Sequence, residues 1–389
     1  MSVNNQYSNL VLLGAYIELC DEKNGNDEYT LEDIRGISTE KKFIPTKANL
    51  DGVSLNAYKV VRRAEFAYVS DTSRRGDKIA LALNTTNNPL LISSIYTTFR
   101  SIDTKKLLPE YLYLLLSREE FDRLSRFNSW GSARETFDWS EFCRIQIPLP
   151  DIDIQQELVD TYNGLKALAE ENEALIKPLT EACKAYIVDC KRKYPEVALG
   201  KYIQPYDERN RNGVYTLEDV RGISTEKKFI ATKANLDGVP LTAYKVVHRD
   251  EFAYVSDTSR RGDKIALALN RTNKPFLISS IYTTFRSIDT DILLPEYLYI
   301  LFSREEFDRL SRFNSWGSAR ETFEWREFCR IQIPLPPLDV QQAIVNVHNC
   351  AEEAKKIGTE AREKMKTLCP ALVQRALNGY SINEKCLIS

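Results

Sequence analysis

The chain contains one segment twice, and this duplication constrains the possible folds more than any other feature. Residues 215–336 align with residues 29–150 at an offset of 186 without a gap, and 15 of the 122 positions differ, leaving 107 identities. A weaker match extends in front, where VLLGAYIEL at 11–19 resembles VALGKYIQP at 197–205. The period lies far above the roughly 20–50 residues of solenoid repeats, so each copy should fold around its own core. A chain of 389 residues is long enough for two such domains.

Within each copy, the local patterns predict both strands and helices. Residues rich in β-branched and aromatic side chains predict strands around 58–69, in KIALAL and in LISSIYTTFR. The segment PEYLYLLLSREEFDRLSRF, from Pro109 to Phe127, predicts one helix with proline in its first turn and its end at Asn128. We therefore expect an α+β fold made of two near-identical α+β domains.

A long helix is predicted after each copy, because residues of a seam recur there at alternating steps of three and four. This spacing is typical of a coiled coil. The middle of the first seam is large and the middle of the second is small, which favours antiparallel packing of the two helices on each other. The alternative is that each helix folds back on its own domain as ordinary core. The expected seam residues are Leu158, Leu165, Leu168, Leu175 and Leu179 in the first helix, and Ile344, Val347, Ala351, Ala354, Gly358, Met365 and Leu368 in the second.

These patterns divide the chain into five parts. They are a first domain at 1–150, a helix at 151–194, a second domain at 195–336, a second helix at 337–380 and a tail at 381–389. No run of about 18 apolar residues predicts a membrane span, and the N-terminus lacks the pattern of a signal peptide. We expect a cytoplasmic protein with no membrane partner.

The cysteines and histidines argue against a thiol or metal site. The eight cysteines contain no C-x-x-C pair, so reduced thiols are expected, with Cys143 and Cys329 as core residues rather than nucleophiles. Of the two histidines, His248 corresponds to Arg62 of the first copy, which excludes a repeated histidine-based catalytic or zinc site. A G-x-x-x-x-G-K-[ST] phosphate loop is absent as well. We expect a chain that is not an enzyme and holds no metal or cofactor of its own.

The order of these features resembles the specificity subunit of type I restriction-modification enzymes, over essentially the whole chain. The resemblance rests on the repeated layout, on GSARETFDWSEFCRIQIPLPDIDIQQ at 131–156 and GSARETFEWREFCRIQIPLPPLDVQQ at 317–342, and on LVQRALNGY at 372–380. It implies two target-recognition domains, at 1–150 and 195–336, held apart by a two-helix spacer and each reading one half of a split double-stranded DNA sequence. The implied partners are DNA methyltransferase subunits, which dock along the helices, and restriction motor-nuclease subunits. S-adenosylmethionine, ATP and magnesium are then expected in those partners.

Two polar loops and one turn of each copy are the candidate DNA contacts. Serine, threonine, asparagine and arginine side chains can donate to phosphates and base edges, tryptophan can stack, and lysine can contact the backbone. Solvated turns and an ordinary charged surface are the alternatives. The candidates in the first copy are Ser70, Thr72, Ser73, Arg74, Arg75, Asn128, Ser129, Trp130, Ser132, Arg134, Lys41 and Lys42. Their equivalents in the second copy are Ser256, Thr258, Ser259, Arg260, Arg261, Asn314, Ser315, Trp316, Ser318, Arg320, Lys227 and Lys228.

Local charge is consistent with this assignment. Residues 29–150 carry 18 Lys and Arg against 15 Asp and Glu, whereas residues 151–196 carry 6 Lys and Arg against 10 Asp and Glu.

Near-identical domains on antiparallel helices should read near-identical half-sites on opposite strands, which predicts an inverted repeat with a fixed, unread gap. Two other functions stay open. One is a specificity subunit whose single partner chain combines methyltransferase and nuclease, and the other is a protein-interaction scaffold or anti-restriction protein.

Overall fold

A computed structural model describes residues 10–377 except for 27, 47–49, 51, 73–77, 132–134, 233, 237, 258–263 and 318–320, without the side chains of 368–377. The chain divides into two compact units. The first consists of residues 1–170 and 358–389, and the second of residues 171–357. Both contain sheets and helices, which confirms the predicted α+β class and the two near-identical halves.

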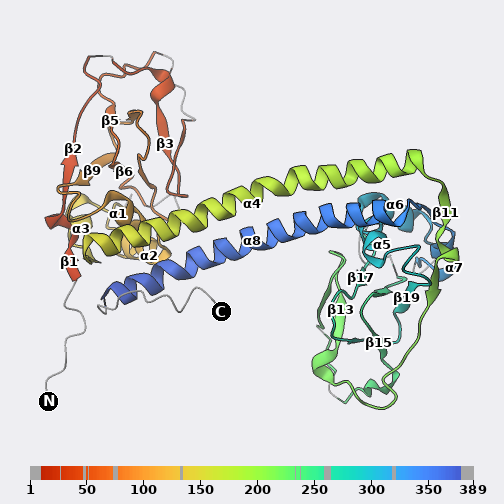
Figure 1. Cartoon of the computed structure of the whole chain (residues 1–389). Helices are drawn as coiled ribbons and strands as arrows, with labels where there is room; N and C mark the ends of the chain where they lie inside the picture. The colour runs from red at the N-terminus through yellow and green to blue at the C-terminus, as the bar shows by residue number, and fades with distance from the viewer. Residues whose placement is uncertain are drawn as a thin grey trace, which may run out of the picture. The chain divides into compact units, whose positions relative to one another are not determined.

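In the first unit, a four-stranded antiparallel sheet with the order β2-β9-β6-β7 forms the centre, and three strand pairs, β1-β10, β3-β4 and β5-β8, accompany it. The helices α1, α2 and α3 lie at the end of the unit nearest to α4, whereas β3 and β5 lie toward the other end (Figure 1). The elements are β1 (Leu10–Leu12), β2 (Ile17–Cys20), β3 (Arg35–Ile37), β4 (Phe43–Pro45), β5 (Lys59–Val61), β6 (Glu65–Tyr68), β7 (Leu81–Leu83), β8 (Leu90–Ile92), β9 (Thr97–Ser101), α1 (Pro109–Leu116), α2 (Glu119–Phe127), α3 (Trp139–Cys143) and β10 (Gln146–Pro148).

The second unit repeats this arrangement. Its central sheet has the order β12-β19-β16-β17, with the pairs β11-β20, β13-β14 and β15-β18. The elements are β11 (Glu196–Ala198), β12 (Ile203–Pro205), β13 (Arg221–Ile223), β14 (Phe229–Ala231), β15 (Lys245–Val247), β16 (Glu251–Tyr254), β17 (Leu267–Leu269), β18 (Phe276–Ile278), β19 (Thr283–Ser287), α5 (Pro295–Phe302), α6 (Glu305–Phe313), α7 (Trp325–Arg330) and β20 (Gln332–Pro334).

An aromatic core holds the central sheet against the short helices. In the first unit the rings of Phe66 and Phe99 stack at 4.7 Å between centroids, and Phe142 of α3 lies 5.0 Å from Phe99. All three side chains are fully buried. Burial of such large apolar side chains supplies much of the driving force for folding.

The helix predicted over Pro109–Phe127 is two helices. Ser117 ends α1, and Arg118 takes an extended conformation with ψ of 151° before α2 begins at Glu119. The break changes the direction of the chain, and Asp122 in the first turns of α2 becomes buried. The apolar pattern continues across the break, which is why the sequence predicts a single helix.

A close contact at the start of each unit requires glycine. A Cβ atom on Gly14 would lie 2.6 Å from Cβ of Cys143, and the same distance separates a Cβ on Gly200 from Cys329. Burial raises the pKa of the Cys143 and Cys329 thiols, so neither forms a thiolate readily. Both cysteines pack against these glycines but are only partly buried, so the prediction that they belong to the core is not met.

Each unit contains part of both long helices, α4 (Ile152–Lys193) and α8 (Leu338–Leu377). In the second unit, Cys183 and Ile187 of α4 line a cavity with His348 and Ala351 of α8, and Cys190 shares a core with Ile344. Residue numbers rise along one helix as they fall along the other, which confirms the predicted antiparallel packing, visible in Figure 1. The first turns of α4 also belong to the core of the first unit, and the first turns of α8 belong to the core of the second unit.

The predicted seam is correct for α8 and wrong at alternate positions of α4. Ile344, Ala351, Ala354, Gly358 and Met365 are buried and Val347 is half-buried, whereas the Leu368 side chain lies outside the described residues. On α4, Leu158 is buried and Leu165 and Leu179 are half-buried, but Leu168 and Leu175 are 43% and 49% exposed.

Residues one position further along α4, such as Ala169 and Cys183, are buried instead. From Leu158 onward, successive positions of the α4 seam are therefore separated by four residues and then three, whereas the prediction had three residues and then four. Small residues are buried on both helices, among them Ala169 on α4 and Ala351 and Ala354 on α8, whereas the leucines that we expected to fill the space beside them are exposed.

A buried glutamine joins each long helix to its unit. Gln155 is fully buried, and its Nε2 donates to the carbonyls of Lys106 and Pro150, both at 2.8 Å. Its Oε1 accepts from the backbone nitrogen of Leu108 at 3.0 Å. Gln341 makes the equivalent three bonds in the second unit. The first glutamine of each predicted QQ pair thus fixes the start of a long helix next to the segment that begins α1 or α5.

Candidate nucleic-acid interface

The two polar loops predicted to contact DNA meet in each unit. The backbone nitrogen of Phe137 donates to the carbonyl of Ser70 at 2.8 Å, and that of Thr72 donates to Glu135 at 3.0 Å. Trp130 and Thr136 exchange two backbone hydrogen bonds, each 3.0 Å long. In the second unit Phe323 donates to Ser256 at 2.8 Å, and Trp316 pairs with Thr322. One small ladder therefore holds both loops at the same place.

An ion pair strengthens this connection. Arg126, at the end of α2, pairs with Glu135, whose carbonyl also accepts from the Thr72 hydroxyl at 3.2 Å. Arg312 and Glu321 form the same pair in the second unit. This pair was not predicted from the sequence, because a nine-residue separation gives no helical or strand signal.

Several predicted donors are used inside the protein. Thr72 is buried, and the Ser129 hydroxyl is buried and donates to the Ser125 carbonyl at 2.6 Å. The Asn128 amide donates to the Leu124 carbonyl at 2.9 Å, which ends α2 with a side-chain cap. Asn314 and Ser315 do the same in the second unit. The expected direct DNA contacts of Thr72 and Ser129 are therefore corrected to structural roles, whereas the Asn128 amide keeps a second N–H and its contact with DNA stays a prediction.

Lys41 and Lys227 also require a correction. The backbone of Lys41 has a positive φ of 59°, and its side chain is only 6% exposed. Its ammonium pairs with Asp122 and donates to the Ile79 carbonyl at 2.8 Å. Lys227 repeats these contacts with Asp308 and Ile265. The ammonium groups are enclosed, so they anchor the end of the first loop instead of meeting DNA phosphates.

Other predicted residues keep an exposed side chain. Trp130 and Trp316 are 67% and 69% exposed, and Lys42 and Lys228 are exposed as well. Phe127 and Phe313, which the sequence analysis did not single out, are 77% and 79% exposed. Exposed aromatic rings next to polar loops can stack on nucleobases.

The remaining candidates lie outside the described residues. They are Ser73, Arg74, Arg75, Ser132, Arg134, Thr258, Ser259, Arg260, Arg261, Ser318 and Arg320.

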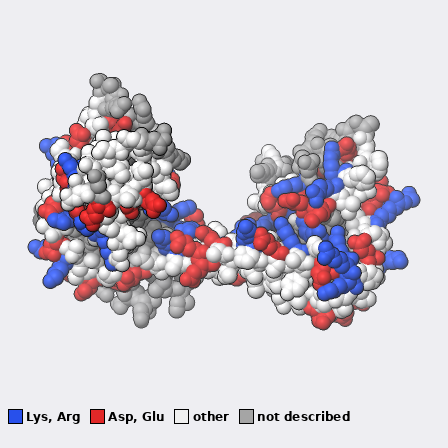
Figure 2. Space-filling view, turned by 90° about the horizontal axis from the view of Figure 1, so that it is seen from above, with Lys and Arg blue, Asp and Glu red and all other residues white. Residues whose placement is uncertain are grey.

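The amino-acid sequence of both loops is the same in the two units. Residues 65–84 are identical to 251–270, and residues 117–137 are identical to 303–323, so all 15 differences between the copies lie elsewhere. Figure 2 shows Lys and Arg intermixed with Asp and Glu on the visible face of both units. Attraction of DNA would then depend on local contacts more than on a uniformly basic surface.

Among the residues that the structure describes, no group of three His, Cys, Asp or Glu side chains is arranged to hold a metal ion. Within the same part of the chain, no helix combines the length and the apolar character needed to cross a bilayer.

Comparisons with known proteins identify the fold. No protein-family model and no curated protein matches the sequence. The S subunit of a type I restriction-modification system from M. genitalium matches in structure with a TM-score of 0.57 and 12% identity, over 98% of this chain and 99% of that one. The HsdS subunit from Thermoanaerobacter tengcongensis overlaps with a TM-score of 0.41 and 18% identity, over 95% and 96%. The similarity to the first structure covers both units and both long helices.

Proposed function

We propose that this chain, which has the fold of a type I S subunit, is the sequence-specific DNA-binding subunit of a type I restriction-modification complex. The observation that carries the proposal is the ladder that brings two polar loops and an exposed tryptophan together, once in each unit, on this fold. Methyltransferase and restriction motor-nuclease subunits would bind the same chain and supply the chemistry, and the assembly would act in the cytoplasm.

The target is proposed to be an inverted repeat with a fixed gap. Identical loop segments present identical donors, acceptors and aromatic rings, so each unit should prefer the same bases. Each unit also combines the beginning of one long helix with the end of the other. Because the two long helices contribute to the two units in this reciprocal way, the arrangement fits a target with two equal half-sites on opposite strands.

Sequencing of methylated bases tests this function. The chain is expressed with its cognate methyltransferase subunit in a host without methylation of its own, and the methyltransferase alone is the control. We expect one bipartite motif whose halves are reverse complements of each other. Two unrelated halves would contradict the inverted repeat, and a lack of any motif would contradict the function itself.

A matched replacement sharpens the test. A variant in which residues 215–336 carry the sequence of 29–150 changes 15 positions and none of the loop segments. It should methylate the same motif as the natural chain. A changed motif would show that bases are read by residues outside the two loops.

A further inference from the structure

Phe127 at the end of α2 and Phe313 at the end of α6 are largely exposed aromatic side chains. Leu124 lies one turn earlier on the same side of α2 and is 39% exposed, and the exposed Trp130 follows three residues after Phe127. Several large apolar side chains exposed within one short segment mark a surface that a ligand or partner covers. Trp130 belongs to the ladder of the candidate nucleic-acid interface, so these side chains continue that interface.

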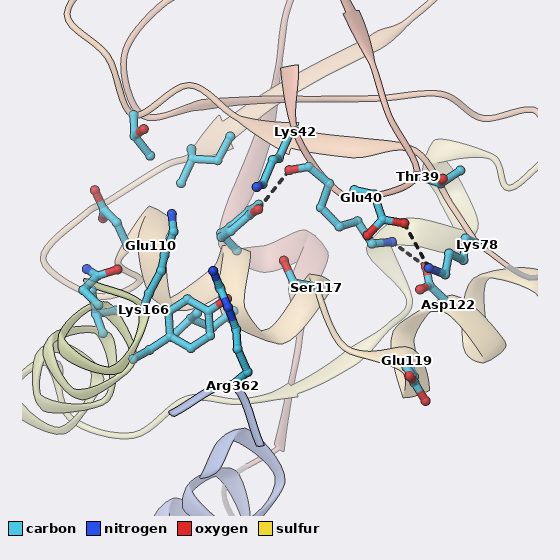
Figure 3. A pocket seen from close by; sticks show the side chains of 18 residues that line it. Thr39, Glu40, Lys42, Lys78, Glu110, Ser117, Glu119, Asp122, Lys166 and Arg362 are labelled. Carbon is cyan, nitrogen blue, oxygen red and sulfur yellow. Dashed lines mark hydrogen bonds and ion pairs between the residues drawn. The ribbon is translucent and has the colours of Figure 1, made fainter. Parts of the chain in front are cut away.

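The backbone that carries Phe127 is fixed on both sides. In the first turns of α2, Asp122 pairs with the ammonium of Lys41 at the edge of the pocket drawn in Figure 3. After the last turn, the Asn128 amide donates to the Leu124 carbonyl at 2.9 Å. The aromatic ring therefore projects from a rigid support, which a side chain needs if it is to force stacked bases apart.

The chemistry of Phe127 differs from that of the polar residues beside it. Its ring has no hydrogen-bonding group, so it cannot read a base edge as Trp130 or Asn128 can. Apolar side chains of this kind act on DNA by insertion between neighbouring base pairs. Arg123, four residues before Phe127, is 68% exposed and lies 3.9 Å from Glu120, a weak surface pair that a phosphate can replace.

We propose, building on the proposed function, that Phe127 and Phe313 each insert into one base step of the half-site that their unit reads. Insertion removes the exposed ring from water, which offsets part of the cost of unstacking the two base pairs. TA and CA steps unstack most easily, so each half-site should contain one of them where the ring enters. The chain would then select this step by its deformability and the other positions by hydrogen bonds.

The fluorescence of 2-aminopurine tests the insertion in the complex of the full chain with its methyltransferase subunit. Each adenine of the methylated motif is replaced in turn, since both TA and CA steps contain adenine and the fluorescence rises when this base loses its stacking. The methyltransferase extrudes the base that it modifies, so that position is left out. We expect one further adenine in each half-site, at a TA or CA step, to become brighter on binding.

The double variant Phe127→Ala with Phe313→Ala should abolish this rise and weaken binding by about 10-fold. Leucine at both positions should restore most of the rise, because it is also an apolar wedge. The matched control is Ile95→Ala with Ile281→Ala, which removes apolar side chains that are 76% and 73% exposed outside the two polar loops. It should change neither the fluorescence nor the affinity.

Three results would overturn the insertion. They are no rise at any adenine other than the methylated one, an unchanged rise in the double alanine variant, and loss of methyltransferase binding by that variant in gel filtration. The last result would assign the phenylalanines to a protein contact. A bipartite methylated motif without the rise rejects the insertion alone, whereas the absence of any motif rejects the proposed function.

Discussion

The carboxylate of Asp122 pairs with the ammonium of Lys41, which lies 81 residues earlier in the chain. The same carboxylate oxygen accepts from the backbone nitrogen of Ile79 at 3.0 Å, and Lys41 donates to the Ile79 carbonyl. One buried ion pair therefore fixes both backbone groups of the residue where the first polar loop returns to β7.

Removal of one partner should be costly. Asp122→Ala leaves the Lys41 ammonium buried without a counter-charge, for which a loss of about 3–5 kcal/mol in the free energy of unfolding is expected. Replacement of both partners by Lys41→Met and Asp122→Leu should cost less than Asp122→Ala alone. Denaturant unfolding measures both, with the exposed Lys42→Met as a control near zero. If the double variant is the less stable one, the burial argument is wrong.

Gly14→Ala should destabilise the first unit by about 1–3 kcal/mol, because the added methyl group would overlap Cβ of Cys143. Gly164→Ala is the control within α4, where nothing lies within 4 Å of the new atom. It should stabilise the helix by about 0.5–1 kcal/mol. Thermal unfolding separates the two, and Cys143→Gly should partly restore the stability of Gly14→Ala.

Gln155→Leu should cost at least about 2 kcal/mol, since it leaves a buried carbonyl, a partly buried carbonyl and a partly buried N–H without their partners. Gln156 is exposed, and its amide donates to Asp160 on the same helix. Gln156→Leu should therefore change the unfolding free energy by no more than about 0.5 kcal/mol. Equal effects of the two substitutions in chemical denaturation would refute the proposed joint between α4 and its unit.

Acid should weaken the second unit through His348. Burial and then the nearby charge of Arg271 hold the pKa of His348 below its usual value, while Glu352 opposes the shift. The unfolded chain takes up this proton at a higher pH than the folded chain, so stability is lost as the pH falls from about 6.5 through the folded pKa. Tyr162 stands at the equivalent position of the first copy, so His348→Tyr should be compatible with the fold. In this variant the melting temperature should depend less on pH in this window. An unchanged profile would show that another group controls it.

Trp130→Ala should weaken DNA binding by the assembled complex without lowering the unfolding free energy, because the ring is exposed. Loss of one base stack is expected to cost about 1–3 kcal/mol. Trp316→Ala should have the same effect if both half-sites are read alike. Trp139→Ala is the contrasting control, since that ring stacks on Phe142 in the core and its removal should destabilise the protein. Fluorescence anisotropy with a duplex carrying the methylated motif measures the affinities.

Much of the fold follows from repeated and periodic patterns. The duplication predicts two equal units, and the alternation of three and four predicts two antiparallel helices. The phase of the α4 seam could not be predicted, because Leu168 and Ala169 both fit a helical stripe and only tertiary packing decides which of them is buried. The break between α1 and α2 was missed for a related reason, since its benefit is the distant contact of Asp122 with Lys41.

The site was predicted as segments and less well as side chains. Both polar loops were found, and the structure brings them together. Serine, threonine and asparagine can satisfy the backbone as readily as a ligand, and sequence does not distinguish these uses for Thr72, Asn128 and Ser129. Lys41 was assigned to the surface because its partner lies far away in the chain. Phe127 went unnoticed because an aromatic residue at a helix end is more often core.

The division of the helices between the units has a consequence for synthesis of the protein. The second unit is continuous in sequence, whereas the first is completed by residues from 358 onward. Chains generally fold from the N-terminus as they leave the ribosome. Here the first unit is translated early but stays incomplete, with one side of α4 uncovered, until nearly the whole chain has been made. The second unit therefore has all of its residues before the first unit does.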